Sequence, residues 1–389
     1  MASFNPIDPG LVSHDQPTPP IFQEVSAAAH VSLDNAVDQT FKTIIDITET
    51  VKFGPKKSLE NKNFYQILPP LAGQFPNIGY TSFVLNVPQE FVSSSQSDKA
   101  IGIEIFAPTK PDPLENKLFI VRDEEVFLEP LNAQQRKTLH THASDQLSQL
   151  EQLPNTPVVI FSHGMGASPR DYRPLIEELA SHGFTVVTLN HPSSSGHAPF
   201  RSQEQAILND LLSPGEKAAA QAANIHFLIG QIHGGQQEQL SKRIDSSRQI
   251  ILAGHSLGGA ASIMASRNNP SIVGCINLDG RLHGKAETKV EGLAMPLLLM
   301  STDHSGDEEN LQVDQEWKTL VESSPQSIHK HISGAGHGDF ALSDTLMNWM
   351  LDETSEEKID PTPSLDTHKV ASQEILKFIT EVVNKRQKS

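Results

Sequence analysis

Ser256 lies in the motif GHSLG (254–258), between the apolar run 250–253 and a segment rich in alanine, glycine and serine. A serine between two glycines at a strand-to-helix turn is typical of a nucleophile, because the glycines leave room for the neighbouring chain. The turn exposes the hydroxyl and directs the N–H groups that follow toward it. We therefore predict that Ser256 is a nucleophile. The alternative is an ordinary turn built from small residues.

A serine hydroxyl needs a base to take its proton and a carboxylate to orient that base. In hydrolases with this serine turn, the chain order is serine, acid, histidine. Six histidines follow the serine, namely His283, His304, His329, His331, His337 and His368. His337 stands in the glycine-rich stretch SGAGHGDF (333–340), from which a late loop can reach back over Ser256, so we predict that it is the base. His329 and His331 alternate within the preceding strand, and we predict that they are structural.

Two aspartates are candidates for the acid of this set. Asp279 follows the apolar run VGCINL, and Asp303 follows LLLMST. Both stand at the C-terminal end of a predicted parallel strand, so either could approach the histidine loop. A carboxylate at a strand end can also cap the next helix. Position in the sequence leaves the choice between the two aspartates open.

The elements that must position these residues are short apolar runs alternating with helical segments. The runs are 157–164, 184–192, 248–254, 271–280 and 295–303. Separated by helices such as 173–183 and 367–386, they predict an α/β fold with a mostly parallel central sheet and helices on both faces. Active sites of such sheets lie at the carboxyl ends of the strands, where the candidate residues are found.

The chain upstream of these runs has a different pattern. Three segments are predicted strands, namely 80–88, 100–108 and 116–121. The first 30 residues are proline-rich and polar, and residues 33–52 carry apolar positions at helical spacing. We therefore predict an N-terminal extension over residues 1–76, partly helical or loosely ordered, and a catalytic domain over residues 77–389.

Composition excludes several classes of function. The 389 residues carry a formal net charge of −17, which disfavours nucleic acid as a partner because phosphate binding needs a basic surface. No run of about 18 apolar residues occurs, so we expect no membrane span and at most transient contact with a lipid surface. The single cysteine, Cys275, cannot form an internal disulfide. No basic stretch followed by an apolar one opens the chain, so we expect a cytoplasmic location.

One further pattern could bind a metal ion. His140 and His142, with Asp145 nearby, form an H-x-H pair in a polar, irregular stretch. No matching ligand cluster stands out elsewhere in the sequence. We therefore predict that the protein uses neither a metal ion nor a cofactor.

The chain resembles the platelet-activating factor acetylhydrolase family in four segments that occur in order. They are FSHGMGASPRDYRPLIEELASHGFTVVTLNHPSSS (161–195), AGHSLGGAAS (253–262), INLDG (276–280) and GAGHGDF (334–340). The resemblance covers roughly residues 77–385. Members of this family are calcium-independent serine esterases and lipases of the α/β-hydrolase fold, so the resemblance implies that fold and that class of activity.

The resemblance also implies roles for individual residues. It favours Asp279 over Asp303 as the acid, because the family's acid follows the strand after the nucleophile's helix in an L-D context. It implies that the backbone N–H groups of Met165 and Leu257 form the oxyanion hole.

The implied substrate is a small-molecule or lipid ester, of the short-acyl or oxidised phospholipid type. Two alternatives stay open: a general carboxylesterase or polyester hydrolase on the same fold, and an inactive α/β-hydrolase that acts as a binding module.

Overall fold

A computed structural model describes the part of the chain that holds the predicted catalytic residues. The described residues are 71–75, 77–88, 98–109, 143–144, 156–196, 198, 201, 206–207, 210–267, 269–284, 290–304, 308–341 and 362–387. The chain divides into two units, Met1–Gln39 and Thr40–Ser389, and every described residue belongs to the second. The predicted strand 116–121, the helical spacing over 33–52, the H-x-H pair and nearly all of the N-terminal extension lie outside the described residues.

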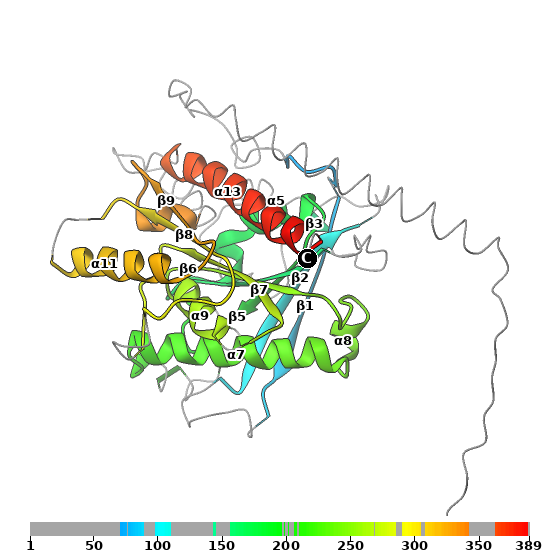
Figure 1. The fold of residues 1–389 in the computed structure, drawn as a ribbon. Helices are drawn as coiled ribbons and strands as arrows, with labels where there is room; N and C mark the ends of the chain where they lie inside the picture. The colour runs from blue at the N-terminus through cyan, green and yellow to red at the C-terminus, as the bar shows by residue number, and fades with distance from the viewer. Residues whose placement is uncertain are drawn as a thin grey trace, which may run out of the picture. The chain divides into compact units, whose positions relative to one another are not determined.

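The described residues form a nine-stranded sheet (Figure 1). The strands are β1 (Ile78–Asn86), β2 (Ala100–Pro108), β3 (Ala143–Ser144), β4 (Val158–Ser162), β5 (Thr185–Asn190), β6 (Ile250–His255), β7 (Ile272–Leu278), β8 (Leu297–Thr302) and β9 (Ile328–Ile332). Their spatial order is β3-β1-β2-β5-β4-β6-β7-β8-β9. Six neighbouring strands, β5, β4, β6, β7, β8 and β9 in spatial order, pair in parallel. Strand β2 is antiparallel to both β1 and β5.

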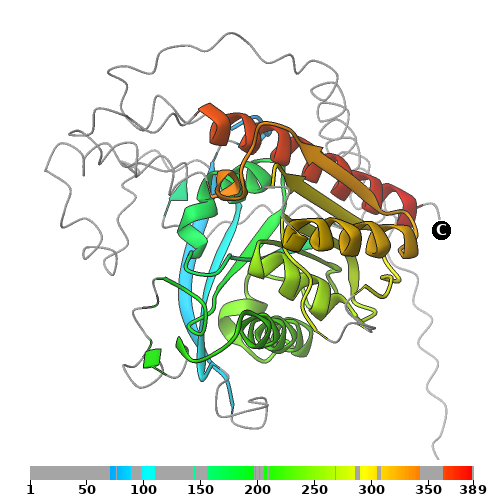
Figure 2. The ribbon, with the colours of Figure 1, turned by 90° about the vertical axis from the view of Figure 1, so that its left-hand side faces the viewer.

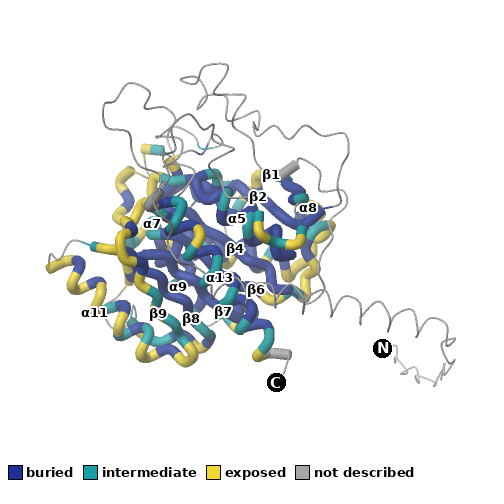
Figure 3. Tube along the Cα trace, turned by 90° about the horizontal axis from the view of Figure 1, so that it is seen from above, coloured by how far each residue is buried: buried dark blue, intermediate teal, exposed yellow. Residues whose placement is uncertain are grey.

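Burial explains why the parallel strands appear in the sequence as continuous apolar runs. Every residue of β4, β6, β7 and β8 is buried, because helices cover both faces of a parallel sheet. Strand β1 instead begins with three buried residues and then alternates partly buried or buried residues with exposed ones. Figure 3 shows this contrast between a buried centre and an exposed outer layer.

Helices cover the sheet in two layers. The helices are α5 (Arg173–Ser181), α7 (Pro214–Gly234), α8 (Glu238–Ser241), α9 (Leu257–Ser266), α11 (Glu308–Ser323) and α13 (Thr362–Gln387), with short 3-10 turns η3 (Pro169–Tyr172) and η4 (His337–Phe340). Helices α7 and α9 pack together on one face, and α5 and α13 lie on the other (Figures 1 and 2). The predicted α/β fold, with a mostly parallel sheet and helices on both faces, is confirmed.

Helix α7 shows how local sequence fixes an element next to the site. Ser213 accepts a hydrogen bond from the Glu216 backbone N–H at 3.3 Å, and Glu216 accepts in return from the Ser213 N–H at 2.9 Å. This reciprocal cap holds the helix start. Gly235, with a φ of 62°, ends the helix in the left-handed region that favours glycine. No helix in the described ranges is both long enough and apolar enough to cross a membrane.

The common direction of the parallel strands determines where the predicted catalytic residues lie. Strands β4, β6, β7, β8 and β9 run in the same direction, so their carboxyl ends share one edge of the sheet. Met165 follows β4, Ser256 follows β6, Asp279 follows β7 and His337 follows β9. Residues separated by about 170 positions in the chain therefore meet at a single edge.

Candidate active site

Ser256 occupies a sharp turn between β6 and α9. Its φ of 54° and ψ of −121° lie in a region that side-chain-bearing residues rarely adopt. A Cβ atom at Gly254 would overlap the backbone of Gly258, and one at Gly258 would overlap the carbonyl group of Ser162. Both flanking positions therefore require glycine. The Ser256 N–H donates to the Leu278 carbonyl at 2.8 Å, which ties the turn to β7.

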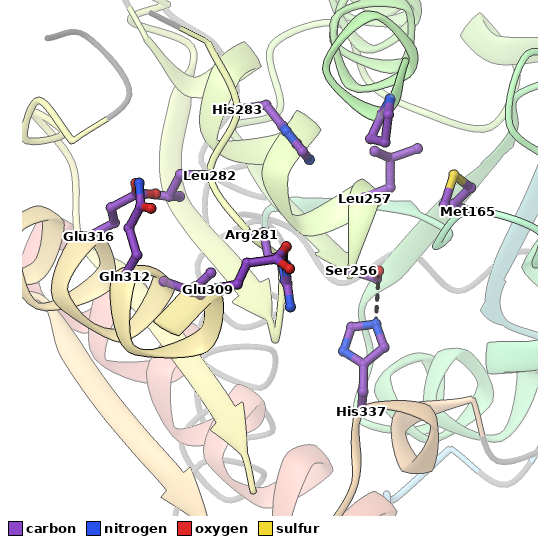
Figure 4. A pocket seen from close by; sticks show the side chains of 12 residues that line it. Met165, Ser256, Leu257, Arg281, Leu282, His283, Glu309, Gln312, Glu316 and His337 are labelled. Carbon is purple, nitrogen blue, oxygen red and sulfur yellow. Dashed lines mark hydrogen bonds and ion pairs between the residues drawn. The ribbon is translucent and has the colours of Figure 1, made fainter. Parts of the chain in front are cut away.

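His337 connects Ser256 with a carboxylate. Its Nε2 lies 2.9 Å from Ser256 Oγ, and its Nδ1 lies 2.7 Å from Asp279 Oδ2 (Figure 4 shows the first contact). Because a carboxylate can only accept, Nδ1 carries the proton and Nε2 accepts from the serine hydroxyl. The three side chains thus form one directed chain of hydrogen bonds.

Asp279 is the aspartate that reaches this histidine. The Thr302 backbone N–H donates to Oδ1 at 3.0 Å, and the Thr302 hydroxyl donates to Oδ2 at 2.9 Å. His304 Nε2 lies 3.1 Å from each carboxylate oxygen. Burial by itself would raise the pKa of Asp279, but hydrogen bonds from His337 and His304 hold this pKa well below its usual range. The carboxylate is therefore charged at neutral pH.

Asp303, the other candidate acid, belongs to a different group. Its Oδ1 accepts from His331 Nε2 at 2.9 Å, and its Oδ2 accepts from the Gly334 N–H at 2.6 Å. His331 Nδ1 lies 3.1 Å from Ser301 Oγ, which also lies 2.8 Å from His329 Nε2. The two histidines predicted to be structural, His329 and His331, therefore form hydrogen bonds at the end of β8 and not with Ser256.

A cavity of about 420 Å³ opens beside Ser256 and His337. Its lining comes from the loops after β4 and β7, the turn after β6, helices α7, α9 and α11, and η4. It comprises Met165, Pro214, Ser256, Leu257, Arg281, Leu282, His283, Glu309, Gln312, Val313, Glu316 and His337. Met165 and Leu257 lie near Ser256 in Figure 4, whereas Arg281 and Glu309 form an ion pair toward α11. The cavity therefore combines an apolar wall beside the serine with a charged wall farther away.

Met165 and Leu257, the two predicted oxyanion donors, line the same cavity as Ser256. Leu257 is the first residue of α9, where backbone N–H groups have no acceptor within the helix. Met165 lies in the loop between Gly164, whose N–H donates to the Tyr172 hydroxyl, and Gly166, whose N–H donates to the Ser194 carbonyl. These neighbouring hydrogen bonds fix the loop beside the cavity.

The sequence did not predict a chain of hydrogen bonds that links the loop after β4, the end of β6 and the loop that carries His337. His255 Nε2 lies 2.9 Å from the His337 carbonyl and therefore donates to it, so Nδ1 accepts from the Tyr172 hydroxyl at 2.8 Å. The Tyr172 oxygen in turn accepts from the Gly164 N–H at 3.1 Å. Burial, with a smaller effect from the charge of His337, lowers the pKa of His255 to about 3, so this ring stays neutral. No sequence signal marked Tyr172.

A second buried network lies behind the β4 loop. His163 Nδ1 donates to the Gly164 carbonyl at 2.8 Å, and its Nε2 accepts from the His191 N–H at 3.0 Å. Asn224 Nδ2 bridges His191 Nδ1 at 3.1 Å and Asp98 Oδ2 at 2.7 Å. Burial lowers the pKa of His163 to about 4 and raises the pKa of Asp98 to about 6.

Across the described ranges, no three histidine, cysteine, aspartate or glutamate side chains are grouped so that they could hold a metal ion. The H-x-H pair at His140 and His142 lies outside those ranges. The expectation of a metal-free mechanism stays a prediction.

Residues 159–356, just over half of the chain, match the model of the alpha/beta hydrolase family. The chain belongs to this family.

Curated relatives extend the comparison. A platelet-activating factor acetylhydrolase from Canis lupus familiaris is 27% identical over 218 residues, covering 48% of each chain. A probable 1-alkyl-2-acetylglycerophosphocholine esterase from Arthroderma benhamiae is 25% identical over 178 residues, covering 45% of this chain and 44% of the relative. The chain thus spans about half the length of the curated relatives it matches. The resemblance to platelet-activating factor acetylhydrolases is confirmed as a distant homology.

Among solved structures, a ferulic acid esterase from Streptomyces cinnamoneus superposes with a TM-score of 0.61 at 21% identity. The match covers 81% of this chain and 92% of that chain. At this identity the likeness concerns the fold.

Proposed function

We propose that this alpha/beta hydrolase cleaves carboxylic esters. Ser256 is the nucleophile, His337 is the base, and Asp279 is the carboxylate that orients this base. One observation carries the proposal. A strained serine at the rim of a cavity is 2.9 Å from an imidazole that is itself 2.7 Å from a buried carboxylate. The roles follow from this geometry because each group is within the distance at which protons are transferred or held.

The reaction proceeds by acyl transfer to water. His337 Nε2 takes the hydroxyl proton while Ser256 Oγ attacks the ester carbonyl, giving a tetrahedral intermediate. Asp279 stabilises the imidazolium through Nδ1–H. His337 then protonates the departing alcohol, and the acyl group stays on Ser256 as an ester. A water molecule, deprotonated by the same imidazole, releases the acid and restores the serine.

The oxyanion of the intermediate is stabilised by the backbone N–H groups of Met165 and Leu257. Both residues line the cavity together with Ser256, and Leu257 opens α9, whose positive dipole end favours negative charge there. Each donor is worth about 3 kcal/mol in the transition state.

The proposed substrates are short-acyl or oxidised phospholipid-type esters. Two relatives support this class, because one is named a platelet-activating factor acetylhydrolase and the other a probable 1-alkyl-2-acetylglycerophosphocholine esterase. The cavity of about 420 Å³ beside Ser256 lies within the size range of small-molecule sites. The rival is a general carboxylesterase. Comparing kcat/KM for p-nitrophenyl acetate and butyrate with a short-acyl phosphatidylcholine distinguishes the two.

Labelling with a fluorophosphonate probe tests the nucleophile. We expect wild type and Ser301→Ala to label, and Ser256→Ala not to label. Ser301 is a matched control because its hydroxyl also contacts an imidazole that contacts an aspartate, yet it is buried and does not line the cavity. His337→Ala should lose nearly all esterase activity while staying folded. Either variant, Ser256→Ala or His337→Ala, keeping more than about a tenth of wild-type kcat contradicts the assignment.

A further inference from the structure

The carboxylate of Asp279 has a second imidazole beside it. His304 Nε2 lies 3.1 Å from both Oδ1 and Oδ2, on the same carboxylate that receives His337 Nδ1. Since a carboxylate only accepts, His304 Nε2 carries a hydrogen in either of its protonation states. A catalytic acid of the proposed kind needs only one imidazole, so the second one calls for an explanation.

Packing holds His304 in this position. Its ring lies 5.4 Å from the ring of Trp317, centroid to centroid, and the indole is fully buried. The indole N–H donates to the Gly280 carbonyl at 3.0 Å, next to the acid in the chain. Helix α11, the end of β8 and the loop that carries Asp279 and Gly280 therefore all lie next to this ring. Only 15% of the His304 side chain is exposed, so the imidazole covers the carboxylate.

Orientation alone does not explain this imidazole. Thr302 already bonds both oxygens of Asp279, through its backbone N–H and its hydroxyl, and so fixes the rotation of the carboxylate. The further contribution of His304 is electrostatic: a neutral N–H draws negative charge from the carboxylate, and a protonated ring adds a positive charge beside it.

The charged groups around His304 come from several elements. The carboxylates of Asp279 and Asp303 both interact with it electrostatically. His337 lies across the Asp279 carboxylate. Helix α11 presents the uncharged Trp317 and carries Asp314, whose carboxylate interacts electrostatically with His329 of β9. His329 lies 6.3 Å from the Trp317 indole, centroid to centroid. The titrating neighbour that shares a hydrogen-bond partner with His304 is therefore His337.

We propose that His304 is a positioning residue that keeps His337 available as a base in more acidic solution. A positive charge on His304 opposes a second positive charge on His337, because both imidazoles share one carboxylate. The N–H of neutral His304 also lessens the negative charge that favours a proton on His337. Both effects act in the same direction. The inference rests on the proposed function of Ser256, His337 and Asp279.

The test is the pH dependence of kcat and KM between about pH 5 and pH 9, measured with p-nitrophenyl acetate. In His304→Ala the acid limb of kcat/KM should move to higher pH by about one unit, because the donor and the charge are both lost. His304→Gln should move it by about half as much, because an amide N–H can still donate. In both variants KM on the alkaline plateau should stay within about twofold of wild type.

His331→Gln is the matched control, because His331 pairs with Asp303 on the neighbouring strand and does not touch Asp279. Its acid limb should coincide with that of wild type. The inference is wrong if the limbs of His304→Gln and wild type coincide, or if His331→Gln moves as far. If His304→Ala fails to fold by near-ultraviolet circular dichroism, His304→Gln decides. An inactive wild type, or an active Ser256→Ala, would instead overturn the proposed function.

Discussion

The ends of β7 and β8 carry the same pair of side chains in different settings. Asp279 lies 2.7 Å from His337, and Asp303 lies 2.9 Å from His331. The two imidazoles are almost equally exposed, at 49% and 48%. The carboxylates differ sharply, since Asp279 is 0% exposed and Asp303 is 54% exposed. A carboxylate–imidazole contact is therefore not enough to distinguish a catalytic pair.

The serines at the two ends differ as well. His337 contacts Ser256, which lines a cavity, whereas His331 contacts Ser301, which is buried within β8. A carboxylate removed from water interacts more strongly with an imidazolium than an exposed one, because the local dielectric is lower. The comparison indicates that access at the serine and burial at the aspartate together define the candidate site.

The largest expected effect comes from exchanging Asp279 for asparagine, and the same exchange at Asp303 is its control. Asp279→Asn should lower kcat about 10⁴-fold, because the amide neither holds His337 in the required tautomer nor stabilises its charge. Asp303→Asn should stay within about twofold, because its pair is exposed to solvent. The measurement is steady-state kinetics at pH 8 on proteins with equal circular dichroism spectra. The reverse ranking would mean that the acid follows β8.

Stability against acid should depend on the buried imidazoles of His163 and His255. Burial lowers the pKa of His163 to about 4 and that of His255 to about 3. Each ring is neutral when folded, whereas the unfolded chain gains a proton near pH 6.5, so their stabilising effect is present above pH 6.5 and is lost as pH falls toward 4. For His163 the loss amounts to about 3 kcal/mol.

The contribution of Asp98 to stability changes with pH in the opposite direction. Its pKa is raised to about 6 by burial, so its contribution is present below its ordinary value of 3.8 and is lost as pH rises through 6. Asp98 therefore offsets part of the stability that the buried histidines lose as pH falls. Urea unfolding at several pH values should show a net decline in the free energy of unfolding below pH 6.5. A flat wild-type curve would contradict the neutral buried rings.

A smaller effect should follow from loosening the His337 loop without touching its carboxylate. Tyr172→Phe removes the hydroxyl that donates to His255 and accepts from the Gly164 N–H. We expect kcat to fall about tenfold with KM nearly unchanged, because an orienting hydrogen bond is worth about 1.4 kcal/mol here. Tyr80→Phe, whose hydroxyl bonds Glu104 on β2, is the control and should keep wild-type kcat. Equal losses in both variants would indicate a general packing defect.

Much of the fold could be predicted because its signals are local. A fully buried parallel strand appears as a continuous apolar run, and the observed β2 covers the predicted residues 100–108. The serine turn is local too, because the overlap that forbids a Cβ at Gly254 involves Gly258, four residues away. Such constraints can be recognised within a few residues of sequence, without the rest of the structure.

The choice of partners could not be predicted in this way. Asp279 and Asp303 both follow apolar strands, and only the order β6-β7-β8-β9, with the loop that carries His337, decides which carboxylate reaches that ring. Tyr172 and His304 reach the site through contacts across 83 and 25 residues. The sequence alone determined the strained serine, the strand pattern and the order of candidate groups. The tertiary structure decided their pairing and burial, because these depend on which chain segments become neighbours in space.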